Sequence, residues 1–444
     1  MILFGRQKDL EVYKMKKEID NLLWVRLDNA AKIYPAARRK NWSNIFRQSV
    51  TFYEDIDVEV LKGALDVIVK RFPSIAARLR KGVFWYYLQQ VEVAPEIKEE
   101  NSYPLAYMNN EEMRKCAFRV IVYNNRLAVE FFHSLTDGTG ALIFVKNLVA
   151  EYLERKYKII IPLEHGIVDR NEAPKEEELE DCFPKYASKY PLSRKDTNAW
   201  HMDGELEKND FLNLTCFKLP VNECLSLAHE YNSTLTVFMS AVMMKALFNL
   251  QKEKNPIVKN QKLIKVLIPI NLRNIFPSNT LRNFAMYTVP ELNPRLGDYS
   301  LKEICEIIKG KMLLEFNAKH MSRVIATNVN DEKNPIVRLI PLPIKNLVMK
   351  AIFDSVGERK SCLSFSNIGK VKFPSVMDQY IERFDFVLGV QAQAPYNCGM
   401  ASYKDTVYVN FIRNIKNPEL EKHFYKVLHE LNISIEVESN LNAR

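Results

Sequence analysis

The sequence has few cysteines and histidines, and neither kind is spaced as disulfide pairs or metal ligands usually are. Its seven cysteines are an odd number and lie far apart, and no C-x-x-C pair occurs among them. No two of its seven histidines stand at ligand spacing. We therefore expect reduced thiols, a cytoplasmic location and no bound metal.

Long apolar stretches are also missing. No uninterrupted apolar run reaches the roughly 18 residues of a membrane-spanning helix, and the N-terminal residues lack the apolar core of a signal peptide. The 63 basic residues are scattered among 54 acidic ones, whereas a nucleic-acid-binding surface requires clustered basic residues. These absences predict a soluble intracellular protein without stable membrane insertion and without a nucleic-acid partner.

What is present suffices for more than one folding unit. The chain of 444 residues is 47% hydrophobic and 26% charged, as globular proteins are, and domains usually run about 100–200 residues. Strand and helix patterns fill residues 1–165 and resume over 205–444. Residues 166–204 contain several prolines and an acidic run, which predict a surface linker between two lobes.

The periodicity of apolar residues predicts individual strands and helices. The expected strands include 49–53, 83–88, 118–123, 127–132, 211–219, 265–270, 384–390, 399–403 and 407–412. The expected helices include 221–231, 237–250, 301–318 and one within 339–356 whose start is delayed by two prolines. In the last helix we expect Asn417 as the N-cap, with His423 and His429 on the solvent side.

One stretch brings a histidine to the end of a strand. Residues 127–132 alternate with period two, so His133 stands where the strand ends. Gly138 and Gly140 then free the backbone for a sharp reversal, and helical spacing resumes after them. An imidazole in this place is a candidate base, although a lone histidine is more often structural.

Asp137 follows His133 by four residues and directly precedes the helix. Its carboxylate could simply cap that helix. The turn is too short to fold the carboxylate back onto the imidazole, so we expect Asp137 to be structural. Its expected partner is a guanidinium, and Arg273 is the candidate because it follows a strand end in the second lobe.

The motif His133-Ser-Leu-Thr-Asp137-Gly138 resembles the H-x-x-x-D-G signature of the CoA-dependent acyltransferase superfamily. This superfamily includes chloramphenicol acetyltransferase, plant BAHD acyltransferases and the condensation domains of peptide synthetases. Other landmarks of the superfamily have counterparts in the second lobe: Pro269-Ile-Asn-Leu-Arg273, Asn283-Phe284, Ser366-Asn-Ile-Gly369 and Pro374. The bacterial alcohol acetyltransferase-like branch is the most similar, given residues 27–35 and 84–87.

The resemblance implies an α/β fold of two chloramphenicol-acetyltransferase-like lobes, each a mixed β-sheet with helices, with a solvent tunnel between them. It implies that His133 is the catalytic base at the centre of the tunnel. Asp137 then points away from the imidazole and pairs with Arg273, and Gly138 belongs to the same active-site turn.

Three polar residues near the end of a late strand are candidates for binding the oxyanion or the substrate: Ser364, Ser366 and Asn367. Preorganised donors of this kind stabilise the tetrahedral intermediate of acyl transfer. The alternative is that this strand end satisfies the backbone of its own turn.

The implied reaction moves an acyl group, acetyl by preference, from acyl-CoA to the hydroxyl of a small-molecule acceptor. An imidazole with an ordinary pKa near 6.5 suits the base, and no covalent intermediate is needed. One alternative is transfer from or to a phosphopantetheine carrier protein, and another is a non-catalytic binding module. Condensation domains usually carry two adjacent histidines, and Phe132 in the first position favours acyl-CoA. Because one chain builds its own tunnel, we expect a monomer.

Overall fold

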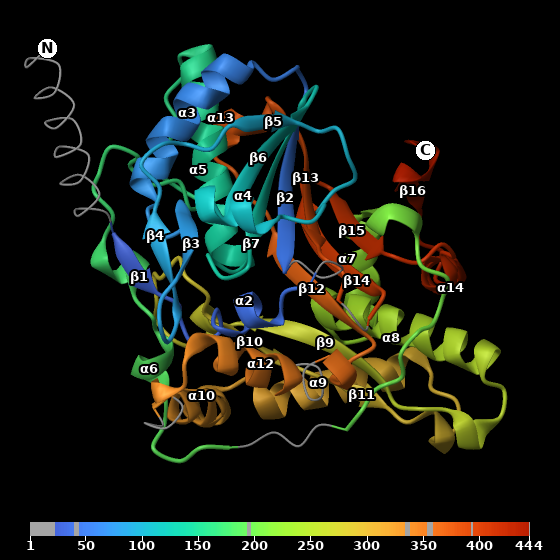
Figure 1. The fold of residues 1–444 in the computed structure, drawn as a ribbon. Coiled ribbons are helices and arrows are strands. Elements are labelled where there is room, and N and C mark those ends of the chain that lie inside the picture. Colours follow the sequence, from blue (N-terminus) through green and yellow to red (C-terminus); the bar gives the residue numbers. More distant parts are fainter. Residues whose placement is uncertain are drawn as a thin grey trace, which may run out of the picture.

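Strands from both halves of the chain form the first sheet. The structure is a computed structural model that describes residues 23–39, 44–192, 197–333, 338–352, 358–391 and 394–443. In spatial order, the strands of this sheet are β13 (Ile381–Leu388), β2 (Ile45–Phe52), β7 (Arg126–Phe132), β6 (Phe118–Tyr123) and β5 (Ile97–Glu99). β5 and β6 run parallel, and the other neighbours run antiparallel. The second half of the chain thus supplies β13 to the sheet of the first half (Figure 1).

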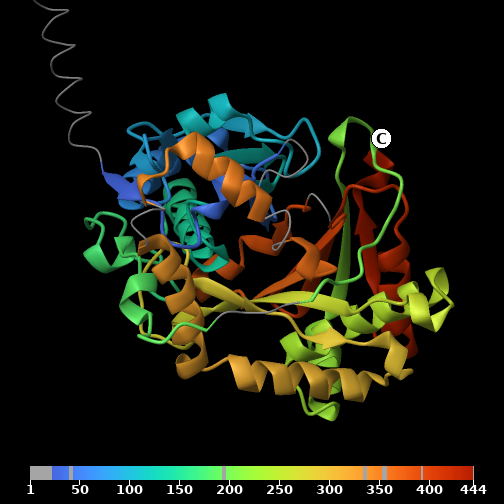
Figure 2. The same cartoon turned by 60° about the horizontal axis from the view of Figure 1, so that its bottom comes forward.

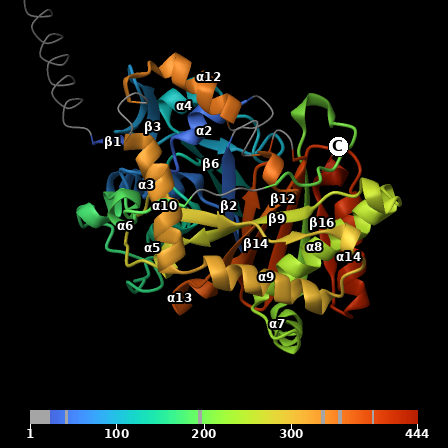
Figure 3. The ribbon, with the colours of Figure 1, turned by 90° about the horizontal axis from the view of Figure 1, so that it is seen from below.

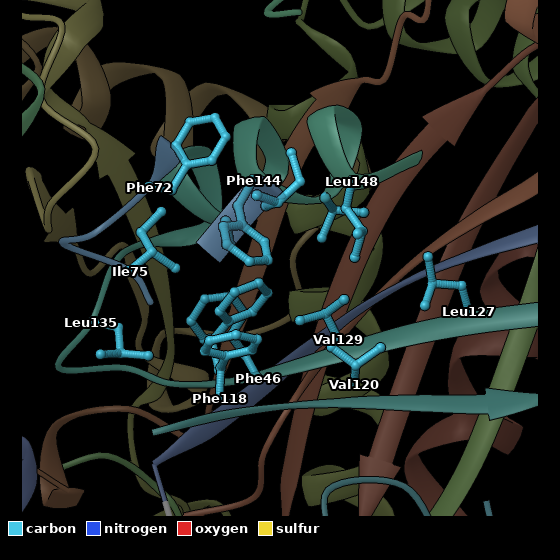
Figure 4. Close-up of a cluster of buried hydrophobic side chains, with 14 of the residues drawn as sticks. Phe46, Phe72, Ile75, Phe118, Val120, Leu127, Val129, Leu135, Phe144 and Leu148 are labelled. Atoms are coloured by element: carbon cyan, nitrogen blue, oxygen red, sulfur yellow. The ribbon is translucent and has the colours of Figure 1, made fainter. Parts of the chain in front are cut away.

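Helices α3 (Val58–Arg71) and α5 (Gly138–Tyr157) pack together against one face of this sheet. The alternating apolar residues of the strands meet them in a buried cluster (Figure 4). Within that cluster the ring of Phe144 on α5 lies edge-on to Phe118 and Phe131. The predicted β6–β7 hairpin is confirmed, with Asn124 at a positive φ of 49° in its turn.

A small sheet lies beside the first one. It contains β1 (Trp24–Arg26), β4 (Tyr86–Gln90) and β3 (Ala77–Lys81), and the short helices α2 (Ile33–Ala37) and α4 (Asn110–Lys115) belong to the same half of the chain. The prediction of a strand over 83–88 was wrong at its start. The amide of Gly82 donates to the carbonyl of Trp85, 2.9 Å away, and closes a tip that exposes Val83 and Phe84.

The second sheet is larger and is also mixed. Its strands, in spatial order, are β10 (Ala285–Thr288), β9 (Ile264–Asn271), β12 (Leu363–Lys370), β14 (Tyr396–Tyr403), β15 (Thr406–Arg413), β8 (Asn213–Pro220) and β16 (Glu436–Ser439), while β11 (Glu291–Leu292) pairs with β9. β12 runs parallel to both β9 and β14. The carboxyl ends of β9 and β12 therefore lie at the same edge.

A layer of helices covers one side of the second sheet (Figure 2). Among the described residues, the α-helices of the second half are α7 (Val221–Glu230), α8 (Leu235–Lys254), α9 (Leu301–Glu315), α10 (Ala318–Lys333), α12 (Leu342–Ile352), α13 (Ser375–Asp378) and α14 (Glu419–Glu430). α8 contacts α7, α9 and α14. Apolar residues surround most of α8, and it is accordingly the buried centre of this layer. Residues 353–356 of the helix expected within 339–356 lie outside the described residues.

Two predictions for the last helix, α14, were wrong. Its N-cap is Pro418 and makes no side-chain cap bond, whereas the backbone oxygen of Asn417 accepts a hydrogen bond from Tyr396. His423 is buried rather than solvent-facing, because its ring contacts the carbonyl of Glu419 and the carboxylate of Glu253. A single-helix periodicity does not reveal a partner on α8.

The stretch predicted as a surface linker is only partly a surface segment. It contains η1 (Glu176–Leu179) and α6 (Phe183–Tyr186). Elsewhere in the described chain, short 3-10 helices are η2 (Lys208–Asp210), η3 (Val258–Asn260), η4 (Leu272–Asn274), η5 (Pro294–Leu296), η7 (Glu358–Lys360) and η8 (Asn440–Ala443). Glu178 makes a two-point ion pair with buried Arg71, and Phe183 is fully buried. η1 and α6 therefore pack into the molecule.

All seven cysteines are buried free thiols. Within the described ranges, no single helix has the length and apolar content to span a membrane. Helices α7 and α8, which are bent by 85° relative to each other, have that length and apolar content only when taken together.

Candidate active site

Asp137 joins the start of α5 to the second half of the chain. One carboxylate oxygen, Oδ1, accepts from the amides of Thr139 and Gly140 at 3.1 and 3.0 Å, which caps the helix. The other, Oδ2, accepts from Arg273 Nη1 at 2.7 Å and from the amide of Phe284 at 2.8 Å. The cap and the ion pair considered in the sequence analysis are thus present together.

Arg273 reaches this carboxylate from η4, directly after β9. Its guanidinium also donates to the carbonyls of Thr280 and Arg282, so the side chain holds the loop after β9 as well as Asp137. Burial acts to raise the pKa of Asp137, but the charge and hydrogen bond of Arg273 outweigh it and hold that pKa below its ordinary value. Asp137 is therefore ionised, and its two oxygens accept hydrogen bonds from the start of α5 and from the second half of the chain.

The expectation that Gly138 and Gly140 permit a sharp backbone reversal was wrong. Both belong to α5, and neither has a positive φ. Gly140 is needed for close approach: a Cβ there would lie 2.2 Å from the carbonyl oxygen of Leu281 and 2.2 Å from Thr136 Oγ1. Gly138 has ordinary room, since its Cβ would lie 3.4 Å from Ile368.

His133 lies just after β7, beside the segment that contains α2. Its backbone amide donates to the carbonyl of Asn44 at 2.9 Å. Its ring stacks on Tyr34, with 4.5 Å between centroids, and lies edge-on to Phe46. The residue as a whole is half-buried. Desolvation lowers the pKa of His133 below its ordinary value, against opposing effects from the residue's own backbone, Asp137 and Asn283.

A chain of hydrogen bonds that passes through Asn283 of the second half fixes the imidazole. His133 Nδ1 lies 3.1 Å from Asn283 Oδ1. The other end of that amide is used, because Asn283 Nδ2 donates to Asp28 Oδ2 at 3.2 Å. Asp28 is fully buried and accepts from the amide of Ala31 at 2.7 Å. The amide of Asn283 is thereby oriented with its oxygen toward the ring.

This orientation decides the tautomer of a neutral His133. An amide oxygen only accepts hydrogen bonds, so Nδ1 must carry the proton. The lone pair of the neutral ring then resides on Nε2, which is the nitrogen free to accept a proton from another molecule. A neutral imidazole with a fixed tautomer is equipped for general-base chemistry.

The three candidates for oxyanion contacts lie on β12. Asn367 holds its own turn: its Oδ1 accepts from the amide of Gly369 at 2.7 Å, and its Nδ2 donates to Thr236 at 2.9 Å. Ser364 is buried and accepts from Gln391. Ser366 is partly exposed. For Asn367 these bonds match the local alternative stated above; a substrate role for any of the three stays a prediction.

A cavity of about 750 Å³ lies between the two sheets. Its lining includes Arg47 on β2 and Arg383 on β13, together with Cys216 and Asn410 from the second sheet. Both arginines pair with carboxylates, so the cavity is polar but balanced in charge. His133 is not among its lining residues, and the tunnel around His133 stays a prediction.

No sequence pattern indicated a role for Asp28, Tyr34 or Asn283. Asp28 and Asn283 are 255 positions apart and touch only in the folded chain. Both residues lie in stretches that carry the superfamily resemblance, and this resemblance was the one sequence signal that could have indicated them as site residues. Among the described residues, no group of three or more His, Cys, Asp or Glu side chains is arranged to hold a metal ion.

The sequence matches no known protein-family profile and no curated protein. The fold, in contrast, is similar to solved structures over nearly the whole chain. F. graminearum TRI101 complexed with coenzyme A and T-2 mycotoxin has a TM-score of 0.62 at 12% identity, covering 93% of this chain and 99% of that one. TRI3 trichothecene 15-O-acetyltransferase from Fusarium sporotrichioides has a TM-score of 0.57 at 12% identity, with 92% and 94% covered.

The first condensation domain of the CDA synthetase is also similar, with a TM-score of 0.56 at 11% identity and with 92% and 96% of the two chains covered. The predicted fold class, two lobes of mixed sheet and helix as in the acyltransferases and condensation domains, is confirmed. At these identities the likeness establishes the fold alone.

Proposed function

We propose that this protein transfers an acyl group from acyl-CoA to the hydroxyl of a small-molecule acceptor, with His133 as the general base. The observation that carries the proposal is the contact between His133 Nδ1 and Asn283 Oδ1. It leaves Nε2 as the proton acceptor of a ring that burial keeps neutral at physiological pH.

The reaction proceeds without an acyl-enzyme. Nε2 takes the proton of the acceptor hydroxyl while that oxygen attacks the thioester carbonyl. The tetrahedral intermediate collapses with cleavage of the carbon–sulfur bond, and protonated His133 then gives its proton to the departing thiolate. Asp137 and Arg273 take no part in proton transfer; they hold the turn after His133 against the loop that carries Asn283.

Acyl-CoA is the preferred donor for two reasons. TRI101, one of the similar structures, was solved with coenzyme A, and Phe132 takes the place of the first histidine of condensation domains. Phe132 is fully buried within β7, so this position is part of the core. A carrier-protein thioester remains the alternative donor, because a condensation domain shares the fold.

The test is release of free thiol from acetyl-CoA with a panel of alcohols and amines. We expect acceptor-dependent thiol release with at least one class of alcohol. Turnover that requires an acyl-carrier thioester would instead support the condensation-type alternative. If calorimetry detects no CoA binding and no acceptor supports thiol release, the protein is a binding module of the same fold.

A further inference from the structure

The side of helix α12 that faces the protein carries two polar anchors, Lys345 and Asn346, beside the buried Leu342. Lys345 is buried, donates from Nζ to the carbonyl of Phe84 at 3.0 Å, and lies 3.4 Å from the centroid of the Trp85 ring. Asn346 donates from Nδ2 to the hydroxyl of Tyr86 at 3.0 Å. A surface helix usually buries its apolar side instead. Here polar anchors fix the opposite orientation.

The apolar side of α12 consequently faces outward. Its spacing of three and four residues places Ile344, Leu347 and Val348 on one face, with exposed fractions of 55%, 71% and 47%. The adjacent tip of the β3–β4 hairpin exposes Val83 and Phe84 and is joined to α12 by the hydrogen bond from the amide of Leu342 to the carbonyl of Val83. We name as the outer patch the hairpin tip, residues 81–84, together with α12 and the residues just before it, 338–352. α12 lies at the periphery of the molecule (Figure 3).

The charge of the outer patch has one sign. Lys81, Arg338 and Lys350 are exposed within it, and neither of its two segments contains an Asp or Glu. A second copy of the chain docked face to face would bring these cations together, which opposes a symmetric dimer. Apolar residues flanked by lysine and arginine instead suit a bilayer with anionic headgroups.

A basic hollow next to the outer patch points the same way. It has a volume of about 680 Å³, and Lys81 of the outer patch is part of its lining. Arg38, Arg80 and Arg114 also line it, and no carboxylate does. Trp24 at its rim is 54% exposed and stacks on Tyr87. Guanidinium groups bind phosphate well, and tryptophan is favoured at the level of lipid headgroups.

We propose that the outer patch is a docking surface for an anionic lipid bilayer, with the basic hollow receiving lipid phosphates. The docking is peripheral: the face of one short helix enters the headgroup region and no helix crosses the bilayer. α12 also packs against α2, whose Tyr34 stacks on His133, so a docked bilayer lies one helix away from the candidate active site. The proposal does not depend on the proposed acyl transfer.

The test is co-sedimentation of the full chain with vesicles of phosphatidylcholine alone and of phosphatidylcholine with phosphatidylserine. We expect binding to the anionic vesicles and a loss of binding at high salt. The double variant Leu347→Ser/Val348→Ser should bind about tenfold more weakly because it removes exposed apolar area. Lys81→Glu/Lys350→Glu should lose the preference for anionic vesicles.

The matched control is Leu313→Ser/Leu314→Ser on α9, where both leucines are also exposed, at 79% and 73%. This control should bind vesicles as the unaltered protein does, and circular dichroism should show all three variants folded. Absence of vesicle binding by the unaltered protein would overturn the proposal. An equal loss of vesicle binding in the control would also overturn it. So would a protein that binds no vesicles and instead forms a dimer that only Leu347→Ser/Val348→Ser dissociates. Vesicle binding that appears only after residues 1–22 are removed would overturn it as well.

Discussion

His133 Nδ1 and the side-chain oxygen of Asn283 lie 3.1 Å apart, and this contact joins the two halves of the molecule at the candidate base. Asn283 is itself held by Asp28, which lies 255 positions earlier in the chain. Three segments remote in sequence therefore determine which nitrogen of the imidazole is free. The identity of that nitrogen is what allows a proposal of general-base catalysis.

Asn283→Ala should lower kcat by about tenfold or more, because Nδ1 loses the acceptor that fixes the tautomer. KM for acyl-CoA should change little, since Asn283 is proposed to act through His133. Steady-state kinetics with separate kcat and KM values checks this. A variant with a lower melting temperature but an unchanged kcat would show that Asn283 is only structural.

The pH dependence of activity should reflect the lowered pKa of His133. The reaction requires the neutral ring, so kcat/KM should rise with pH to a plateau, with an apparent pKa below about 6.5. An apparent pKa above that value would contradict the desolvated environment described for the ring.

Stability should depend on the same ionisation. Between the folded pKa of His133 and about 6.5, the unfolded chain binds the proton more readily than the folded chain. The free energy of unfolding should therefore fall as pH drops through that window. His133→Gln should remove this part of the pH dependence in urea unfolding. If the two profiles run parallel, the ring does not titrate as stated.

Arg273→Ala should lower the free energy of unfolding by about 3–5 kcal/mol, because Asp137 would remain charged and buried without its partner. Activity should fall as well, since the loop that carries Asn283 loses its anchor. Arg155→Ala is the matched control: the Arg155 side chain is 41% exposed and pairs with Glu151 on α5, and a pair with an exposed partner contributes less than about 1 kcal/mol. Equal losses in urea unfolding would contradict the account.

Two glycines two positions apart in sequence, Gly138 and Gly140, should respond differently to alanine. Gly140→Ala places a Cβ 2.2 Å from a backbone oxygen and should cost about 1–3 kcal/mol of stability. Gly138→Ala meets ordinary contacts and should be neutral or slightly stabilising, because alanine favours helix by about 1 kcal/mol over glycine. Thermal unfolding of the two variants, compared with the unaltered protein, tests this difference in stability. A loss at Gly138 as large as that at Gly140 would contradict the packing described.

Sequence patterns predicted what is local in this molecule. Alternation located the β6–β7 hairpin, and the position of Asp137 before a helical pattern indicated its cap. The pattern did not reveal that β13 joins the first sheet, because alternation indicates which face of a strand is buried and not which strand it pairs with. The contacts of Asn283 and His423 were missed for the same reason: their partners are remote in sequence.

The central claim is that the imidazole of His133 is the proton acceptor in acyl transfer. The most direct test compares thiol release from acetyl-CoA by the unaltered protein and by His133→Ala at neutral pH, with the acceptor that gives the fastest turnover. The account predicts a folded variant with the same CoA affinity and a rate lower by about 10²–10⁴-fold. A His133→Ala protein that turns over at the ordinary rate would contradict it.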